Sequence, residues 1–229
     1  MSTRTAAESR ADYEQVMGPD LGAIYAELVQ ELCNIYVVWG QYKILFGIKQ
    51  SRVDLLNKAG GTFIRVAQDC IFDQVILAIA RLTDKPEIAG KQTLTVRRLA
   101  TLISDAALAD AVRAKVDLAM TAQDFCRDWR NNRIGHNNLD MRINPNARAL
   151  LPATRLKVDA ALTSLAEVLN LIASRLLDSE TAYDHIVTPL PDATWLLYTL
   201  HDGLAVQGER HKRLKAGDFS SIEAYPRDL

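Results

Sequence analysis

Apolar residues recur every three or four positions along most of this chain, and this spacing is the strongest constraint on its fold. It predicts a one-sided helix from Leu21 to about Phe46, with Asp20 near its start. The strict alternation of apolar and polar residues that marks β-strands is absent over any useful length. An all-α fold is therefore expected. The helix from Leu21 carries its apolar stripe on Ile24, Tyr25, Leu28, Leu32, Ile35, Tyr36 and Trp39.

The middle of the chain divides at a few start and stop signals. Gly60 and Gly61 interrupt the periodicity, and a second helix is expected over 62–82, as the most buried of all. Residues 83–92 have the composition of a loop. Thr95 begins a short helix over 96–103, and Asp105 caps a long helix that ends near Ile134.

The remainder predicts one strong helix and one weaker helix. Pro189 and Pro191 precede the weaker helix, which is expected over 195–207, before the charged run GERHKRLKAG at 208–217. That run is more often a solvated face than a nucleic-acid contact. Four good helices with short connections favour a four-helix bundle. The strong helix follows a loop over 137–152 and carries its apolar stripe on Leu156, Val158, Ala161, Leu165, Val168, Leu169, Ile172 and Leu176.

Composition and charge exclude several function classes. The chain has 229 residues, an apolar share of 48% and a formal net charge of −1. Nucleic-acid binding must therefore depend on a local patch and not on the total charge. Cys33, Cys70 and Cys126 are far apart and are expected to be reduced core thiols. No signal peptide and no uninterrupted apolar run of membrane-spanning length are present, so a cytoplasmic protein without membrane contact is expected.

The stretch WRNNRIGHNNLD, residues 129–140, is unusually rich in arginine, asparagine and histidine. An ordinary helix end explains it well, because Gly135 would be a left-handed terminator and the cations would face the negative end of the helix dipole. A phosphodiester site explains it too. Arg130 would grip a phosphate, His136 would move protons, and Asn131 would orient either group. A chain reversal at Gly135 would bring the imidazole back toward the guanidinium.

Two patches of the sequence resemble known proteins. The pattern of Arg130, Asn131 and His136 resembles the signature of HEPN domains. In that signature an arginine is followed by a polar residue and then, after a gap of four to six residues, by a histidine. The whole stretch resembles the abortive-infection (Abi), AbiU-like branch of that superfamily. The segment ARLTDKPEIAGKQTLTVRRL, residues 80–99, resembles a second patch of the same branch. The resemblance covers roughly residues 21–177, with Gly135 where relatives often carry alanine.

The resemblance implies a fold and a chemistry. The fold is a HEPN-type four-helix up-down bundle over 1–178, with extra N- and C-terminal helices and a C-terminal extension over 179–229. Such bundles form homodimers whose two motifs line one cleft. The implied activity is metal-independent RNA cleavage by 2′-hydroxyl attack, with no cofactor, in a phage-defence or toxin–antitoxin setting.

The implied site consists of six residues, and two functions remain open for it. Arg130, His136 and Asn131 are the catalytic candidates, and an antitoxin or another defence-system protein is a further expected partner. The alternative is a catalytically inactive helical module that binds RNA or a protein partner. His185 and His201 are expected at packing or helix-surface positions. The candidates for RNA contact are Arg127, Arg133 and Asn132.

Overall fold

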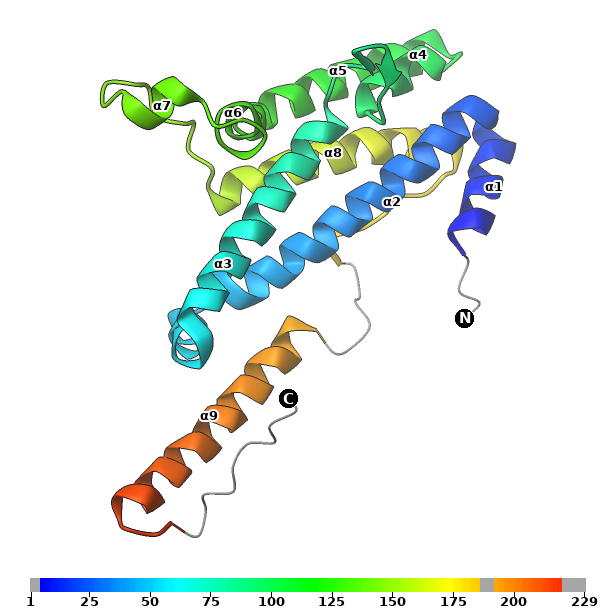
Figure 1. Cartoon of the computed structure of the whole chain (residues 1–229). Coiled ribbons are helices and arrows are strands. Elements are labelled where there is room, and N and C mark those ends of the chain that lie inside the picture. The colour runs from blue at the N-terminus through cyan, green and yellow to red at the C-terminus, as the bar shows by residue number, and fades with distance from the viewer. Residues whose placement is uncertain (1–4, 186–191, 220–229) are drawn as a thin grey trace. The chain divides into compact units, whose positions relative to one another are not determined.

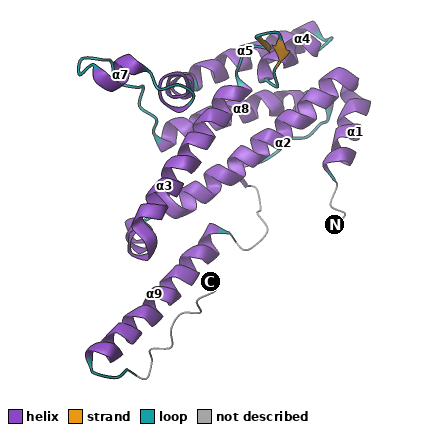
Figure 2. Ribbon diagram, viewed as in Figure 1, coloured by secondary structure: helices purple, strands orange, loops and turns teal. Residues whose placement is uncertain are grey.

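The computed structural model describes residues 5–185 and 192–219, and nearly all of its regular structure is helical (Figures 1 and 2). The all-α prediction is confirmed. The helices and helical turns are α1 Ala6–Met17, α2 Pro19–Tyr42, η1 Lys43–Gly47, α3 Gln50–Leu82, η2 Val96–Arg98, α4 Leu99–Leu102, α5 Ala106–Ala122, α6 Asp124–Trp129, η3 Arg130–Ile134, α7 Leu139–Ile143, α8 Arg155–Leu176, η4 Tyr183–His185 and α9 Ala193–Lys215, and the strands are β1 Glu87–Ile88 and β2 Lys91–Gln92.

The chain divides into two compact units. Unit 1 consists of residues 1–40 and 70–187, and unit 2 consists of residues 41–69 and 188–229. Helices α2 and α3 each contribute to both units. The predicted domain boundary between residues 178 and 179 stays a prediction, because a compact unit is not the same thing as an independently folding domain.

The core of unit 1 lies among α2, the second half of α3, the α5–α6 pair and α8. The Trp39 indole on α2 donates a hydrogen bond to Asp159 on α8, at 2.7 Å, and its ring contacts Phe72 on α3. The Phe72 ring in turn meets Trp129 of α6 edge-on, with centroids 5.7 Å apart. Helix α5 packs against α8 in the opposite direction (Figure 1). These contacts form the expected four-helix bundle.

Polar side chains at the helix starts explain why the sequence signals were informative. The Asp105 carboxylate accepts hydrogen bonds from the backbone N–H groups of Ala107 and Leu108 at the start of α5. The Thr95 hydroxyl accepts from Arg97 at the start of η2, and Thr154 caps α8 in the same way. Each side chain satisfies a donor that has no partner within its own helix.

Helix α8 is the most buried helix, and the expectation that 62–82 would hold that place was wrong. Nine residues of α8 are buried, and Leu165 and Ile172 are completely so. By contrast, Phe63 of α3 is 74% exposed. Leu156, expected in the apolar stripe of α8, is 81% exposed. It lies in the first turn of the helix.

Several segments are more regular than the sequence predicts. The helical stretch labelled α3 begins at Gln50, before the glycine pair, and its winding is interrupted at Gly60, where φ −177° and ψ 57° are not helical, so the predicted break at the glycines is confirmed. The expected loop at 83–92 contains the β1–β2 hairpin. Ala89 and Gly90 have φ values of 50° and 75°, which suit a two-residue hairpin turn. The expected loop over 137–152 contains α7, and α9 continues through most of the charged run to Lys215.

One stretch within the described residues, Pro19–Gly47, is long and apolar enough by composition to cross a membrane. It is interrupted by Glu27, which is exposed, so it is not a continuous apolar run. Its apolar side is occupied by protein, because Leu28, Leu32 and Trp39 are at most 1% exposed. Helix α2 is therefore a core helix of the bundle.

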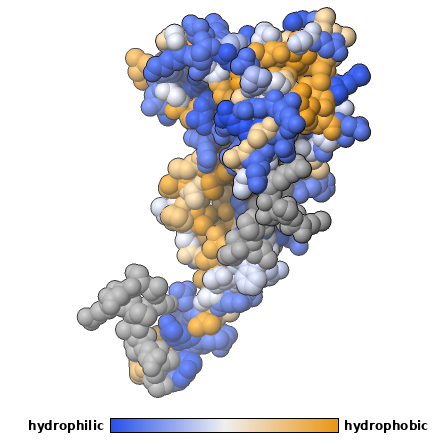
Figure 3. All heavy atoms as spheres, turned by 90° about the vertical axis from the view of Figure 1, so that its right-hand side faces the viewer, coloured by the Kyte–Doolittle hydropathy of each residue, from blue (hydrophilic) through white to orange (hydrophobic). Residues whose placement is uncertain are grey.

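Unit 2 has a small core of its own. Leu45 and Leu56 come from residues 41–69, and Ala193 and Leu197 come from α9. The Ala193 N–H donates a hydrogen bond to the Gln41 side chain, at 2.7 Å. Apolar side chains also reach the surface of the protein, and Figure 3 shows hydrophobic patches among hydrophilic residues on the face that it presents.

Candidate functional site

The Arg-to-His motif lies where α6 continues into a π-helical turn, η3. The Gly135 N–H donates to the Arg130 carbonyl at 2.8 Å, a hydrogen bond that spans five residues. Gly135 has φ −83° and ψ −28°, so the predicted left-handed terminator is wrong. The helix widens here by one residue per turn and does not reverse abruptly. Single π-helical turns within α-helices are frequent at functional sites.

Arg130 is held by a carboxylate from the other recognised patch. Its guanidinium forms an ion pair with Asp84, which follows α3 and lies 46 residues earlier in the sequence. The side chains are 28% and 14% exposed, respectively. Arg127 reaches the same place, since its Nη2 donates to the Thr83 carbonyl at 3.2 Å. The structure thus brings together the two patches that carry the family resemblance.

Arg133 lies on the other side of the turn. Its guanidinium carbon is 4.6 Å from the centre of the Trp129 ring, a cation–π distance. Its Nη2 lies 4.0 Å from an oxygen of Asp73 on α3. The side chain is nevertheless exposed, which leaves its predicted contact with RNA open.

His136 and Asn131 reach the solvent. Both residues are exposed, and no hydrogen bond or ion pair involves the His136 imidazole within 5–185 and 192–219. The backbone of His136 directly follows the N–H that bonds Arg130. The imidazole is therefore accessible to a ligand.

Asn132 points inward and braces the segment that follows. Its amide donates to the backbone carbonyl and to the carboxylate of Asp128, at 3.0 and 2.9 Å. Its own oxygen accepts from the Asn138 amide at 2.8 Å. This geometry ties residues 128, 132 and 138 into one network directly beneath the exposed side of the turn.

Asp128 anchors that network. It is buried, pairs with Arg148 and accepts a hydrogen bond from the Leu151 N–H at 2.8 Å. The Arg148 guanidinium is the main reason that the pKa of Asp128 lies below its usual value, and burial acts in the opposite direction. The Trp129 indole also donates to the Leu151 carbonyl, at 2.8 Å. The sequence analysis missed both Asp84 and Asp128 as site residues. Asp84 lies within the second resembling patch, residues 80–99, whereas nothing in the sequence signalled Asp128.

The cysteines and histidines outside the motif contribute little here. Cys126 is buried, and burial raises the pKa of its thiol. Cys70 is exposed, so the expectation that all three cysteines are core thiols was wrong. His185 lies at the surface beside Asp184. Over the residues that the structure describes, no group of three or more His, Cys, Asp or Glu side chains could hold a metal ion.

Comparison with known proteins gives one match. A family model described as AbiU2, a HEPN-type family, matches residues 18–193, which is most of the chain. No curated protein and no solved structure matches the chain. The match includes both patches and the four helices of the bundle. The chain therefore belongs to the AbiU2 family of HEPN-type, abortive-infection-related proteins.

Proposed function

We propose that this protein is a metal-independent endoribonuclease that acts in phage defence or as a toxin. The supporting observation is the arrangement around Arg130. Its guanidinium is fixed by Asp84, while His136, just beyond the same π-helical turn, is exposed and open to a ligand. One short segment of backbone thus carries a group that can bind phosphate, Arg130, and a group that can transfer protons, His136.

The chemistry follows from the two side chains. His136 accepts the proton of the ribose 2′-hydroxyl as that oxygen attacks the adjacent phosphorus. Arg130 holds the phosphate and stabilises the negative charge that grows on its oxygens. The 5′-oxygen leaves and takes a proton from an acid, which yields a 2′,3′-cyclic phosphate and a 5′-hydroxyl end. DNA lacks the attacking hydroxyl, so RNA is the substrate.

Asp84 has a positioning role in this proposal. A guanidinium carries five N–H donors, and the Asp84 ion pair occupies only one edge of it. The remaining donors stay available to a phosphate, and the pair limits the rotation of the long side chain. An arginine fixed in advance loses less conformational entropy when the substrate binds.

The proposed assembly is a homodimer in which the two motifs share one cleft, so that the second copy supplies the acid for the leaving group. An antitoxin or another defence-system protein would restrain the activity. Light scattering on the purified protein tests the dimer directly. A mass of one chain at micromolar concentration would contradict it.

A second candidate function is a catalytically inactive module that binds RNA or a protein. One observation favours it, since Arg130 is already paired with a carboxylate and Arg127 with a carbonyl. Both cations are thereby partly compensated. The experiment below separates the two functions, because an inactive module binds without cutting.

The test is RNA cleavage by the full-length protein with EDTA present. We expect wild type to cut an unstructured RNA, and His136→Ala and Arg130→Ala to lose about 10²- to 10⁴-fold in rate. The matched controls are His185→Ala and Arg113→Ala, which change surface residues outside the motif. A 2′-deoxy nucleotide at the cut position should abolish cleavage. Equal cleavage by the motif variants and wild type would exclude this site.

A further inference from the structure

Unit 2 contains an open groove whose volume is about 750 Å³. Its walls are the first turns of α3 and the first half of α9, two segments about 145 positions apart in the sequence. All of its lining residues belong to unit 2, so it is separate from the Arg-to-His motif. Apolar Leu55 and Leu197 form part of the lining, and the rest of the lining is polar or charged.

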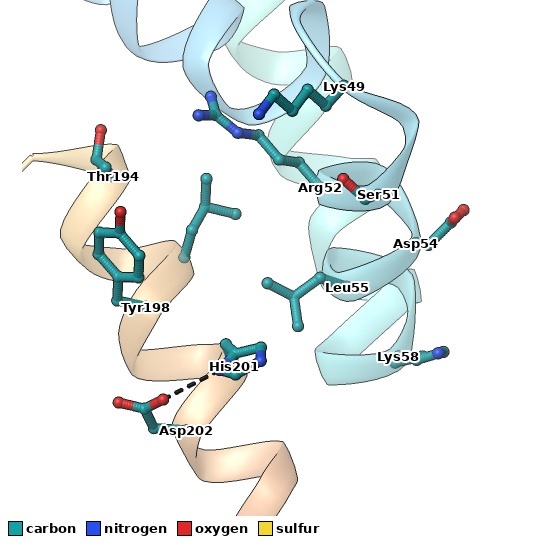
Figure 4. Close-up of a pocket in the computed structure, with 11 residues that line it drawn as sticks. Lys49, Ser51, Arg52, Asp54, Leu55, Lys58, Thr194, Tyr198, His201 and Asp202 are labelled. Atoms are coloured by element: carbon teal, nitrogen blue, oxygen red, sulfur yellow. Dashed lines mark hydrogen bonds and ion pairs between the residues drawn. The ribbon is translucent and has the colours of Figure 1, made fainter.

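One end of the groove is cationic. Lys49 and Arg52 extend from the start of α3 toward the α9 side, near Thr194 (Figure 4). Arg52 is fixed by a 2.7 Å hydrogen bond from its Nη1 to the Ile44 carbonyl, which leaves its other donors available. Lys49 has no carboxylate partner in the described part of the chain. Two cations without acidic partners in a groove form a site for an anion.

The groove lining has three cations, Lys49, Arg52 and Lys58, and two aspartates. Asp54 points away from α9 in Figure 4 and accepts a hydrogen bond from Gln50, at 3.0 Å. The Asp202 carboxylate lies 3.0 Å from Nδ1 of its neighbour His201. Residues 41–69 as a whole carry five lysines and arginines and only two aspartates. The part of unit 2 that forms one wall of the groove is therefore basic, although the whole chain is close to neutral.

Large aromatic side chains stand exposed on the other wall. Tyr198 lines the groove and is 64% exposed, and Trp195, one turn earlier on α9, is 54% exposed. The buried core of unit 2 uses Leu197 and Ala193 of the same helix, so these rings are not needed for packing. Basic side chains next to exposed aromatic rings are the combination that binds single-stranded nucleic acid, through phosphate contacts and base stacking.

We propose that this groove binds single-stranded RNA, with Lys49 and Arg52 on the backbone phosphates and an unpaired base stacked on Tyr198. It is a second RNA contact, apart from the motif that cuts. The inference rests on the proposed function only in taking RNA as the ligand. It assigns a role to the segment 41–69 and to α9, which the bundle itself does not require.

The test is fluorescence anisotropy with the full-length protein and a labelled, unstructured RNA of about twelve nucleotides, within the range of known single-strand sites. The RNA carries 2′-O-methyl groups throughout, so it cannot be cut. We expect Lys49→Ala and Tyr198→Ala each to weaken binding about tenfold. The slope of log affinity against log salt should become shallower by about 0.7 for Lys49→Ala, the loss of one phosphate contact.

Matched variants make the result specific. Arg65→Ala removes an exposed cation of α3 that does not line the groove, and it should bind within about twofold of wild type. Tyr198→Phe keeps the ring and should restore binding. His136→Ala should bind normally, which separates failure of this site from failure of the ribonuclease proposal. Absence of binding by wild type, unchanged binding by Lys49→Ala and Tyr198→Ala, or equal affinity for a duplex of the same sequence would overturn the inference.

Discussion

The arginines of the motif and the cations of the groove occupy different electrostatic surroundings. In unit 1, Arg130, Arg133 and Arg148 each lie beside an aspartate. In unit 2, Lys49 has no such neighbour in the described part of the chain, and Arg52 bonds only a backbone carbonyl. The sequence shows the same division, with 17 lysines and arginines against 20 acidic residues in unit 1, and 10 against 8 in unit 2.

The difference separates two uses of positive charge. A cation fixed by a carboxylate belongs to a pair without net charge and has a defined position. This suits a group that must contact a transition state. A cation without a carboxylate keeps its full attraction for phosphate, which suits binding over a longer surface. The two units therefore divide positioning and attraction between them, and each can be tested separately.

The largest expected effect concerns the motif. His136→Ala should lower kcat for RNA cleavage by about 10²- to 10⁴-fold with little change in KM, because it removes proton transfer and not binding. The melting temperature should stay at the wild-type value, since the imidazole is exposed and makes no internal bond in the described residues. Steady-state kinetics with EDTA and a thermal melt check both statements. A rise in KM alone would place His136 among the binding residues.

Removing the carboxylate beside Arg130 should have the next largest effect. Asp84→Asn keeps the shape of the side chain but loses the ion pair that holds the guanidinium. We expect kcat to fall about a hundredfold, the size of effect produced by small misplacements of catalytic groups. Asp110→Asn, which releases an exposed arginine on α5, is the matched control. Faster cleavage by Asp84→Asn would mean that the pair restrains the site instead of preparing it.

Asp128→Asn should weaken unit 1 without touching the exposed part of the motif. It replaces the charge that Arg148 and the Leu151 N–H stabilise, and we expect the free energy of unfolding at neutral pH to fall by about 2 kcal/mol. The folded pKa of Asp128 is lowered, so its contribution is present above the ordinary carboxyl pKa and is lost as the pH falls through the acid range. Urea titrations at neutral and acid pH should therefore show a difference between wild type and variant that shrinks on acidification. A difference that does not depend on pH would refute the charge-based explanation.

The smallest effect is expected in the groove. Lys49→Ala should raise KM for a long RNA by about tenfold and leave kcat unchanged, because it removes a contact made equally in the ground state and the transition state. Arg65→Ala, which changes an exposed cation of α3 outside the groove, should leave both constants unchanged. Kinetics at low and high salt complete the test, since the difference between Lys49→Ala and wild type should narrow as salt screens the phosphate contacts. A loss confined to kcat would join the groove to the catalytic chemistry and remove the division between the units.

The sequence predicted those parts of the molecule that depend on local rules. Thr95 and Asp105 cap helices because their side chains satisfy donors only two or three residues away. The Ala89–Gly90 hairpin was missed because its strands have two residues each, too few for any alternation. The interruption of α3 at Gly60 was predicted from the glycine pair, whereas the helical turns before it, from Gln50, were not.

The site was predictable only where the resemblance supplied a pattern. That pattern pointed to Arg130, Asn131 and His136, but the partners that fix the turn come from distant segments. Asp84 lies 46 residues before Arg130, and Arg148 lies 20 residues after Asp128. The groove has no local signature either, because Lys49 and Tyr198 meet only through the fold of unit 2. Contacts of this kind are set by tertiary packing, which the periodicity of the sequence does not reveal.

The widened last turn of the motif helix bears on how its spacing can vary. A five-residue hydrogen bond from Gly135 to Arg130 accommodates one more residue than an ordinary turn before the chain leaves the helix. An insertion there is absorbed as a bulge, whereas in a regular helix it would rotate everything downstream by about 100°. Deleting Asn132 would restore an ordinary α-helical turn and point the His136 imidazole in a different direction. The π-helical turn thus sets the direction in which the chain presents His136 after Arg130.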